Sequence, residues 1–306
     1  MKKGDSQGIM DTVGFIGIGT MGKRMSARIL RGGYTVRAYD IVPEALAEAE
    51  KNGAVACSSP MEAVQGSDIV ITILPNSHDV EEAVYGENGI LKGAHPGLIY
   101  IDMSSSDPSS TRKISKDMED RGVQMLDAPV SGGPKGAESG TLSILVGGDA
   151  QIMKKVLPLL RTMGDKEKII YTGGHGTGHT AKAVNNLLFG TTMIATCEAL
   201  ELGVKAGIPT ETMVKVISSS SGLSYSIQKL ADYALVGKVD PGFSIQLLVK
   251  DMGIASNLAV EENVNVDVCQ RSREYFLQGL ERGWGGFDNT KILELFEESG
   301  GVTVRL

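Results

Sequence analysis

A lysine and two asparagines at helical spacing are the first residues in this chain that could do chemistry. Lys182 and Asn186 are four residues apart, and Asn185 lies three residues after the lysine. Side chains at these spacings share one helix face, about one turn apart. A lysine near the buried start of a helix is costly unless it has a partner or a function. The position therefore indicates that Lys182 has either a partner or a function.

A serine and two glycines after a predicted strand form a second group. Ser131-Gly132-Gly133 lies in a stretch, 127–142, that is rich in glycine and proline, so its backbone can approach a ligand closely. Consecutive N–H groups beside a hydroxyl would suit a carboxylate. An ordinary connecting loop explains the same composition, and both interpretations stay open.

A glycine-rich turn near the N-terminus predicts a dinucleotide site. A short apolar strand from Val13 runs into Gly17-Ile18-Gly19-Thr20-Met21-Gly22, and a helix follows. Gly17 would permit the tight turn, Gly19 would let backbone approach a pyrophosphate, and Gly22 would allow close helix–strand packing. Thr20 and Met21, in the same loop, are expected to contact the cofactor as well.

An acidic residue ends the second predicted strand. Asp40 stands eighteen positions after Gly22, where a carboxylate would accept hydrogen bonds from the adenosine ribose hydroxyls. Its charge would repel a 2′-phosphate, so we expect NAD rather than NADP. The alternative is a structural turn for the glycines and a helix cap before Pro43 for Asp40.

Polar residues at the ends of two later strands extend this predicted site. The apolar run 68–74 ends at Pro75-Asn76, and the run 98–102 leads to Ser105. In open parallel sheets, ligands bind beyond the carboxyl ends of the strands. We therefore expect Pro75, Asn76 and Ser105 to contact the cofactor, whereas Asp107 before Pro108 is expected to cap a helix.

Three further charged or titratable residues are ambiguous. Lys250 precedes Asp251 in an otherwise apolar helical run, and the residues alone favour a solvated position over a cation directed at an anionic ligand. His175 and His179 flank the Lys182 turn and could titrate near neutrality. Histidines in loops and first turns are more often solvent-facing or capping, and that is our expectation for both.

The elements that position these residues divide the chain in two. Alternating strands and helices predict an α/β, Rossmann-type, doubly wound parallel sheet, followed by an all-α domain. A helix from about Gly178 to Ala206, roughly 40 Å long, would join them. We expect a flexible tail (1–12), a dinucleotide-binding domain (13–176) and an all-helical substrate and oligomerisation domain (177–306). A further strand is expected at 123–126, and the closing strands at 143–146 and 168–171. Helices are expected at 150–163, 210–218, 224–236, 244–261, 267–282 and 288–298, with N-caps at Ser244 and Asp288 and stops at Gly237, Gly283 and Gly300.

Composition excludes several classes of function. A chain of 306 residues with 42% hydrophobic and 22% charged residues is long enough for two cores. The formal net charge of -7 argues against binding to nucleic acid or an anionic membrane. Three distant cysteines give neither a disulfide framework nor a zinc signature, so we expect no metal and a cytoplasmic protein. The first eight residues have charge but no apolar segment, so we expect a loose tail rather than a signal peptide, and no continuous run of about eighteen apolar residues is present.

Five motifs in order resemble the β-hydroxyacid dehydrogenase family. They are the glycine turn with Met21, Asp102-Met103-Ser104-Ser105, Asp127-Ala128-Pro129-Val130-Ser131-Gly132-Gly133, Gly176-x-Gly178-x-x-x-Lys182-x-x-Asn185-Asn186, and Lys250-Asp251. The resemblance covers the chain from Val13 onward. The family includes 3-hydroxyisobutyrate dehydrogenase, tartronate semialdehyde reductase and 2-(hydroxymethyl)glutarate dehydrogenase.

The resemblance implies NAD(P)-dependent interconversion of a 3-hydroxy acid and its semialdehyde. Lys182 matches the catalytic lysine, the turn Ser131–Gly133 the carboxylate cradle, Asn186 the residue that orients the substrate, and Lys250 the residue that closes over the cofactor. During alcohol oxidation, hydride goes to the nicotinamide and the hydroxyl proton to a base. Lys182 must then be neutral, which requires burial or nearby positive charge.

Some features separate this chain from individual members. It lacks the insertion of close 3-hydroxyisobutyrate enzymes between Ser224 and Phe243, and Gly222-Leu223-Ser224-Tyr225 is closer to the reductase and glutarate types. Asp40 departs from the NADP-preferring members. Imine or related carbonyl reduction and a non-catalytic cofactor-binding protein are the alternatives, although imine reductases usually lack the lysine. Apolar helices suggest a homodimer or homotetramer.

Overall fold

The computed structural model describes residues 11–238 and 241–306, so the expected tail lies almost wholly outside the described residues. By its internal contacts the chain divides into two compact units, Met1–Lys182 and Ala183–Leu306. Each unit has its own hydrophobic core, as expected for a chain of this length. The two are described separately.

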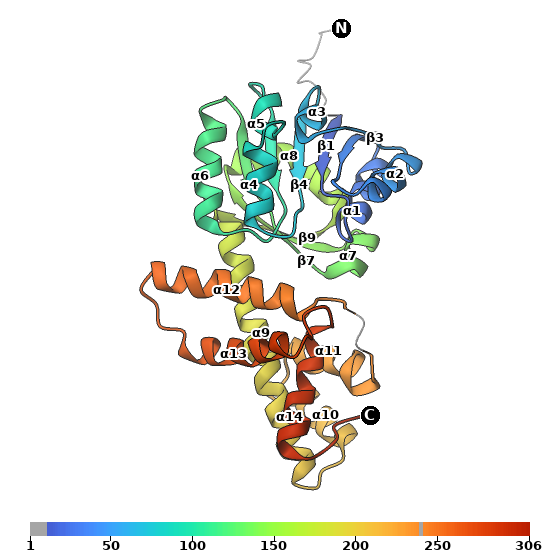
Figure 1. Ribbon diagram of the computed structural model, residues 1–306, viewed down its shortest axis with the longest axis vertical. Helices are drawn as coiled ribbons and strands as arrows, with labels where there is room; N and C mark the ends of the chain where they lie inside the picture. The colour runs from blue at the N-terminus through green and yellow to red at the C-terminus, as the bar shows by residue number, and fades with distance from the viewer. Residues whose placement is uncertain (1–10, 239–240) are drawn as a thin grey trace. The chain divides into compact units, whose positions relative to one another are not determined.

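A twisted sheet with helices on both faces forms the first unit (Figure 1). The strand order is β3-β2-β1-β4-β5-β6-β8-β7, with β9 paired to β8, and β1 to β6 are parallel. The order reverses between β1 and β4, which is the switch point of a doubly wound sheet. The strands are β1 (Thr12–Ile16), β2 (Thr35–Tyr39), β3 (Val55–Ala56), β4 (Ile69–Thr72), β5 (Ile99–Asp102), β6 (Gln124–Asp127), β7 (Val130–Ser131), β8 (Leu142–Gly148) and β9 (Gly164–Gly173).

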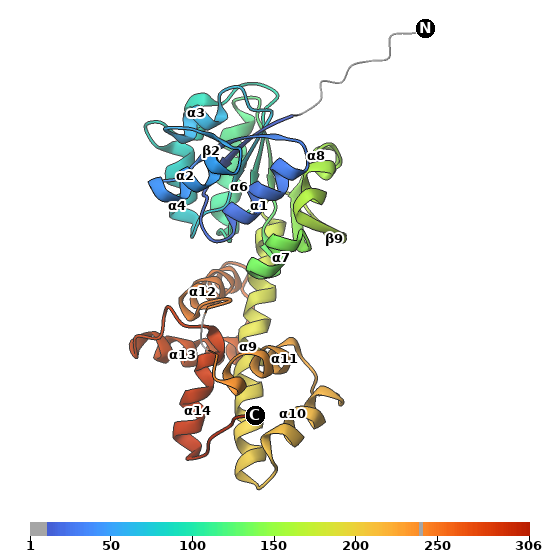
Figure 2. The same ribbon diagram turned by 90° about the vertical axis from the view of Figure 1, so that its right-hand side faces the viewer.

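Alternate strand residues enter two cores, one on each face of the sheet. Phe15 packs with residues of α1 and α8, whereas Ile16 packs with residues of α4 and α6. Figure 2 shows α1 and α8 side by side on one face. Burial on both faces explains the continuous apolar strands. The helices of this unit are α1 (Gly22–Arg31), α2 (Pro43–Lys51), α3 (Pro60–Val64), α4 (Ser77–Tyr85), α5 (Ile90–Gly93), α6 (Pro108–Glu119), α7 (Gly133–Ser139) and α8 (Ala150–Met163).

The far edge of the sheet differs from a purely parallel arrangement. β8 runs antiparallel to β6 and to β7. The segment expected to be a loop, 127–142, contains both β7 and the short helix α7. The glycines and the proline of this helix are typical of a loop, so the sequence does not predict it. In the structure, Pro134 lies in the first helical turn and Gly140 ends the helix in a left-handed conformation (φ +72°).

The second unit is all helical among its described residues, as the sequence predicts. Ser244 caps α12 by accepting from the Leu247 N–H, and Asp288 accepts from the Thr290 N–H. The C-terminal stop of the last helix is Gly301 (φ +64°) rather than Gly300, which lies inside the helix against Glu201. The elements are α9 (Thr177–Lys205), α10 (Thr210–Ser218), α11 (Tyr225–Asp232), η1 (Ala234–Val236), α12 (Ile245–Glu261), α13 (Asp267–Glu281), η2 (Asn289–Ile292) and α14 (Leu293–Gly300).

Helix α9 begins in the first unit and is unusually apolar. Its composition and its length of 29 residues would suffice to cross a membrane, and no other helix of the described residues passes that test. The core of the helical unit includes Ala183, Met193 and Cys197 of this helix, which is typical of a core helix in a globular protein. Only 39% of its most apolar window is buried, however, so part of its apolar surface is exposed.

Candidate functional site

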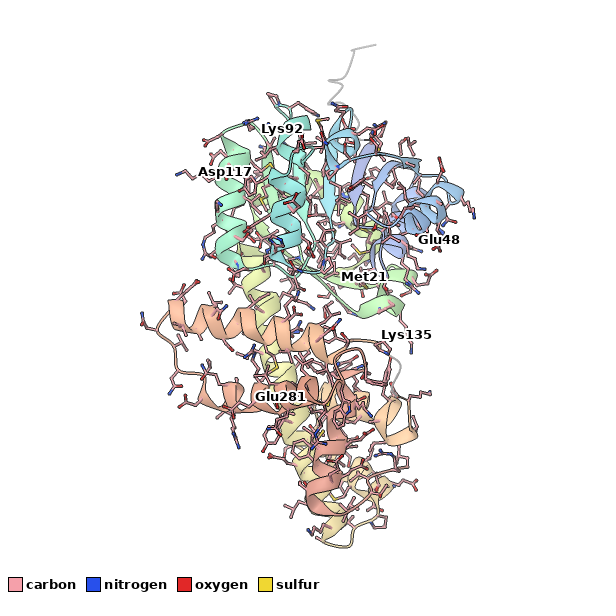
Figure 3. All side chains as sticks on the ribbon, in the orientation of Figure 1. Met21, Glu48, Lys92, Asp117, Lys135 and Glu281 are labelled. Atoms are coloured by element: carbon pink, nitrogen blue, oxygen red, sulfur yellow. The ribbon has the colours of Figure 1, made fainter. Side chains whose placement is uncertain are left out.

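The loop between β1 and α1 has the geometry of a dinucleotide-binding turn. Gly17 has φ +98°, and an added Cβ would lie 2.4 Å from the Ile73 carbonyl oxygen. A Cβ on Gly22 would lie 1.8 Å from the Gly17 carbonyl oxygen, whereas one on Gly19 would meet nothing within 4 Å. Two glycines therefore allow the loop to fold, and the third leaves open space for a ligand. Thr20 and Met21 complete this loop, and Met21 is labelled in Figure 3.

Asp40 lies at the end of β2 and fixes the same loop. Its carboxylate accepts hydrogen bonds from the Ile18 N–H at 2.5 Å and from the Val42 N–H at 2.8 Å. The second bond is a local turn contact before α2, so the structural explanation for Asp40 holds in part. A carboxylate has about four acceptor positions. It can therefore hold the glycine loop and still accept from a ribose hydroxyl.

The predicted residues after β4 and β5 lie in two loops that are joined by hydrogen bonds. The Leu74 N–H donates to Ser104 Oγ at 2.9 Å, and the Asp107 N–H donates to Ser77 Oγ at 2.7 Å. Asn76 is the N-cap of α4, since its Oδ1 accepts from the Asp79 N–H. Pro75 and Ser105 flank these contacts at the ligand-binding edge of the sheet. Asp107 caps α6, as expected.

The serine-glycine turn lies beyond the carboxyl end of β6. Ser131 pairs with Ser143 of β8, and it is followed by two glycines in the left-handed region, Gly132 with φ +127° and Gly133 with φ +60°. Such successive positive φ values are strained for other residues. The turn lies at the same edge as the strand ends above, so its N–H groups and the Ser131 hydroxyl can receive an anion.

A buried carboxylate on β6 holds the first turn of α9. Asp127 accepts from the Gly176 N–H at 2.8 Å and from the His179 N–H at 3.0 Å, and it is fully buried. Lys182 follows three residues after His179, and only 9% of it is exposed. The residue with the predicted function is therefore buried near the start of a helix whose origin is fixed on the sheet.

His179 is buried, contrary to the expectation of a solvent-facing or capping histidine. Only 1% is exposed, and its ring contacts Thr111 Oγ1 at 2.7 Å and the Ser104 carbonyl oxygen at 3.1 Å. Asp102 Oδ2 lies 3.7 Å from the ring. These contacts join α9 to α6 and to the loop after β5. His175 is exposed and contacts the Met125 carbonyl oxygen.

A buried polar chain continues from Asp102 into the sheet. Thr72 Oγ1 lies within hydrogen-bond distance of Asp102 Oδ1 and of the Tyr100 hydroxyl, both at 2.9 Å. Burial raises the pKa of Tyr100 well above its ordinary value, and the Asp102 carboxylate adds to this effect. Tyr100 is therefore a neutral structural group. Sequence spacing gave no signal for this network, because its members come from β4, β5, α6 and α9.

The two candidates in the helical unit are connected by a third residue. Asn186 Nδ2 donates to Asp251 Oδ2 at 2.6 Å, and Lys250 Nζ lies 3.0 Å from Asp251 Oδ1. Asn186 and Asp251 are buried, with 3% exposed each, and Lys250 is half-buried rather than fully solvated. Asp251 therefore fixes the orientation of the Asn186 amide. The only sequence signal for this role is the charged pair Lys250-Asp251 in an apolar helical run.

The predicted residues thus form two sets, one on each unit. The sheet unit carries the glycine turn, Asp40, the strand-end residues, the serine-glycine turn and Lys182, which together could hold a dinucleotide and an anion beside an amine. The helical unit carries Asn186 and Lys250. Among residues 11–238 and 241–306, no group of three or more His, Cys, Asp or Glu side chains is arranged to hold a metal ion.

Known families match both halves of the chain. Residues 12–173 match the NAD binding domain of 6-phosphogluconate dehydrogenase, and residues 176–296 match the family described as NAD-binding of NADP-dependent 3-hydroxyisobutyrate dehydrogenase. The two matches meet at the start of α9.

Curated relatives are similar along almost the whole chain. The chain is 39% identical to 2-(hydroxymethyl)glutarate dehydrogenase of Eubacterium barkeri, covering 95% of this chain and 97% of the relative. It is 35% identical to NAD-dependent L-serine dehydrogenase of Pseudomonas aeruginosa, covering 95% and 100%. It is 33% identical to mitochondrial 3-hydroxyisobutyrate dehydrogenase of Mus musculus, covering 94% and 87%.

Solved structures share the fold. The 3-hydroxyisobutyrate dehydrogenase of Mycobacterium tuberculosis with L-serine superimposes with a TM-score of 0.85 at 30% identity, covering 94% of this chain and 99% of that one. An imine reductase from Myxococcus stipitatus has a TM-score of 0.63 at 20% identity, covering 94% and 99%, which shows a common fold alone.

Proposed function

The chain belongs to the β-hydroxyacid dehydrogenase family, and on this premise we propose that it is an NAD-dependent dehydrogenase of small 3-hydroxy acids that uses Lys182 as general acid and base. The reaction interconverts a primary alcohol and its semialdehyde. The main support for the proposal is the burial of Lys182 near the start of α9. Asp127 holds the first turn of this helix by hydrogen bonds at the carboxyl end of β6, in the dinucleotide-binding sheet.

The names of the relatives suggest the substrate class. L-serine, 3-hydroxyisobutyrate and 2-(hydroxymethyl)glutarate share the unit HO–CH2–CH(R)–COO⁻ and differ in R, which is an amino group, a methyl group or a carboxyethyl group. We infer that this chain acts on the same unit. A fixed carboxylate site and one proton carrier would then serve every member of the class, and R would select among them.

The proposed roles follow from the chemistry of that unit. Ser131, Gly132 and Gly133 bind the substrate carboxylate through N–H groups and a hydroxyl. Lys182, in its neutral form, accepts the hydroxyl proton of the alcohol during oxidation and returns it during reduction. Asn186, held by Asp251, orients the hydroxyl with its amide. Lys250 is proposed to close over the cofactor.

The nicotinamide cofactor, when bound, accepts the hydride that leaves the alcohol carbon. The glycine turn fits its pyrophosphate, because the space beside Gly19 is open. Thr20, Met21, Pro75, Asn76 and Ser105 are proposed to line the rest of its site. NAD is proposed over NADP because Asp40 is an anion and the next residue, Ile41, is apolar and 85% exposed, so neither would bind a 2′-phosphate.

The test is NAD(P) reduction with a panel of acids that share the proposed unit and differ in R. We expect turnover with at least one primary 3-hydroxy acid, higher kcat/KM with NAD than with NADP, and no turnover of the matching 2-hydroxy acids. Reduction of cyclic imines with no activity toward any hydroxy acid would instead favour the imine reductase alternative and would contradict the proposal.

We also propose that the protein is a cytoplasmic homodimer or homotetramer. The exposed apolar residues of α9 support the assembly, because a second copy would cover Val184, Leu188 and Leu202, which are 51%, 61% and 71% exposed. The free state of Cys57, Cys197 and Cys269 supports a reducing compartment.

A further inference from the structure

We propose that Asp127 is a positioning residue that sets the distance between the substrate carboxylate site and Lys182. This inference rests on the proposed role of Lys182, but it assigns a task to a residue that the catalytic scheme does not use. Asp127 is fully buried and comes from β6, whereas the backbone it holds comes from α9, 49 and 52 residues later in the chain.

Gly176, the residue directly before α9, has no side chain that could cap the helix. Helices usually begin at a Ser, Thr, Asp or Asn whose side chain accepts from the first free N–H groups. Here Gly176 precedes the helix, and its carbonyl oxygen accepts from the Thr180 N–H. The two oxygens of Asp127 accept from the Gly176 and His179 N–H groups. A carboxylate on another element therefore does the work of the cap.

Gly178 and Gly147 allow the backbones of α9, β6 and β8 to lie close enough for Asp127 to accept these hydrogen bonds. A Cβ on Gly178 would lie 2.4 Å from the Leu145 carbonyl oxygen and 2.9 Å from Asp127 Oδ2. A Cβ on Gly147 of β8 would lie 2.6 Å from Asp127 Oδ1 and 2.8 Å from the Gly178 nitrogen. A side chain at either position would therefore push the start of α9 away from β6 and β8.

The segment that begins with Asp127 also carries the serine-glycine turn. Ser131 is four residues after Asp127, and the segment between them is fixed by two backbone bonds, from Ala128 N–H to Asp102 and from Leu145 N–H to Pro129. One short, buried segment therefore positions both the carboxylate site and the lysine helix. A displacement of about 1 Å between reacting groups can reduce turnover by about a hundredfold.

The charge of Asp127 provides a readout that a purely structural role would not change. Lys182 follows the capped turn, at an axial rise of roughly 5 to 9 Å from the two residues whose N–H groups Asp127 binds. Other titratable groups around Asp127 are Asp102 on the neighbouring strand and His175 and His179 on the α9 side. Removing the negative charge should make the lysine lose its proton at a lower pH, by about half to one pH unit.

The experiment compares Asp127→Asn with Asp127→Glu. Asp127→Asn keeps the shape but presents an NH2 group to one of the two helix N–H groups and loses the charge. We expect kcat for alcohol oxidation to fall at least tenfold, NAD affinity to stay within twofold, and the acidic limb of the kcat profile to move to lower pH. Asp127→Glu keeps the charge but moves it, so kcat should fall while the limb stays in place.

The control is Asp149→Asn, which changes the side-chain cap of α8 in the same unit. It should leave kcat and the pH profile unchanged. Wild-type kcat and an unmoved limb in a folded, NAD-binding Asp127→Asn would overturn the proposal, and so would an equal loss in Asp149→Asn. If Asp127→Asn does not fold, Asp127→Glu with wild-type kcat has the same consequence.

A substrate-free measurement separates this inference from the proposed function. The pH dependence of amine labelling at Lys182, followed by mass spectrometry, reports the protonation of the lysine in each variant without any turnover. A labelling midpoint that shifts in Asp127→Asn supports the effect of Asp127 on Lys182. This holds even if Lys182→Ala remains active, and in that case only the catalytic role of Lys182 is contradicted. An unshifted midpoint together with unchanged kcat contradicts the inference while leaving the proposed function intact.

Discussion

At the scale of single residues, the glycine turn separates the demands of folding from those of binding. Gly22 has no room for a side chain because of the Gly17 carbonyl oxygen, whereas Gly19 faces open space. A methyl group should therefore weaken ligand binding at Gly19 and destabilise the fold at Gly22.

Gly19→Ala should leave the melting temperature nearly unchanged and weaken NAD binding at least tenfold, because the methyl group would occupy the space proposed for the pyrophosphate. Gly22→Ala should lower the free energy of unfolding by about 3 kcal/mol through overpacking. Calorimetric titration with NAD and thermal unfolding measure the two effects. A stable Gly19→Ala variant that binds NAD as tightly as the wild type would contradict the proposed site.

Asp40 allows a test of cofactor choice. Asp40→Asn removes the charge that would repel a 2′-phosphate and keeps one oxygen, which can retain one of the two backbone hydrogen bonds. The ratio of kcat/KM with NAD to that with NADP should fall about tenfold. Asp68→Asn is a matched control, since Asp68 also accepts backbone N–H bonds, from residues 11 and 12. An unchanged ratio in Asp40→Asn would count against a ribose contact.

Cys197 gives a pH prediction for stability. Complete burial raises the pKa of this thiol, with a further contribution from the carboxylates of Glu198 and Glu297. Below about pH 8.5 the thiol is protonated in both folded and unfolded chains, so it adds no pH dependence. Above that pH only the unfolded chain ionises, and the free energy of unfolding falls by up to about 1.4 kcal/mol per pH unit.

Cys197→Ala should remove this contribution. Denaturant titrations between pH 6 and 10.5 should show a shallower alkaline decline in the variant and parallel curves below pH 8. Equal slopes above pH 9 in both proteins would show that the buried thiol does not carry the effect.

At the scale of elements, local chemistry explains what the sequence could predict. The caps at Asp107, Ser244 and Asp288 lie within three residues of the N–H groups they bind, and the helix 150–163 has the bounds that its periodicity predicts. The glycine turn is similarly local.

Contacts between distant segments explain what could not be predicted. The burial of His179, where the sequence predicts a solvent-facing or capping residue, depends on contacts with Thr111 and Ser104, which are 68 and 75 residues earlier in the chain. Helix α7 has no helical signature in the sequence, because its glycines and proline are typical of loops. The cap that Asp127 provides for α9 has no signature in spacing, since the two segments meet only after the sheet has formed.

At the scale of the whole molecule, the exposed apolar residues of α9 predict self-association. Leu188→Glu and Leu202→Glu place a charge on the face proposed for a second copy, so each should lower the mass measured by light scattering. Val260→Glu, at a residue that is 72% exposed on α12, tests whether any charge on the helical unit has this effect. A wild-type protein that is monomeric at micromolar concentration would remove the basis of this prediction.

The central claim is that the buried amine of Lys182 carries the proton of the reaction. The most direct test is the turnover number of Lys182→Ala for alcohol oxidation at saturating NAD, with Lys205→Ala, an exposed lysine at the end of the same helix, as the control. We predict a fall of about a hundredfold to ten-thousandfold in kcat for Lys182→Ala, with NAD affinity within twofold and no loss in the control. Turnover equal to that of the wild type in a Lys182→Ala protein that binds NAD normally would contradict the claim.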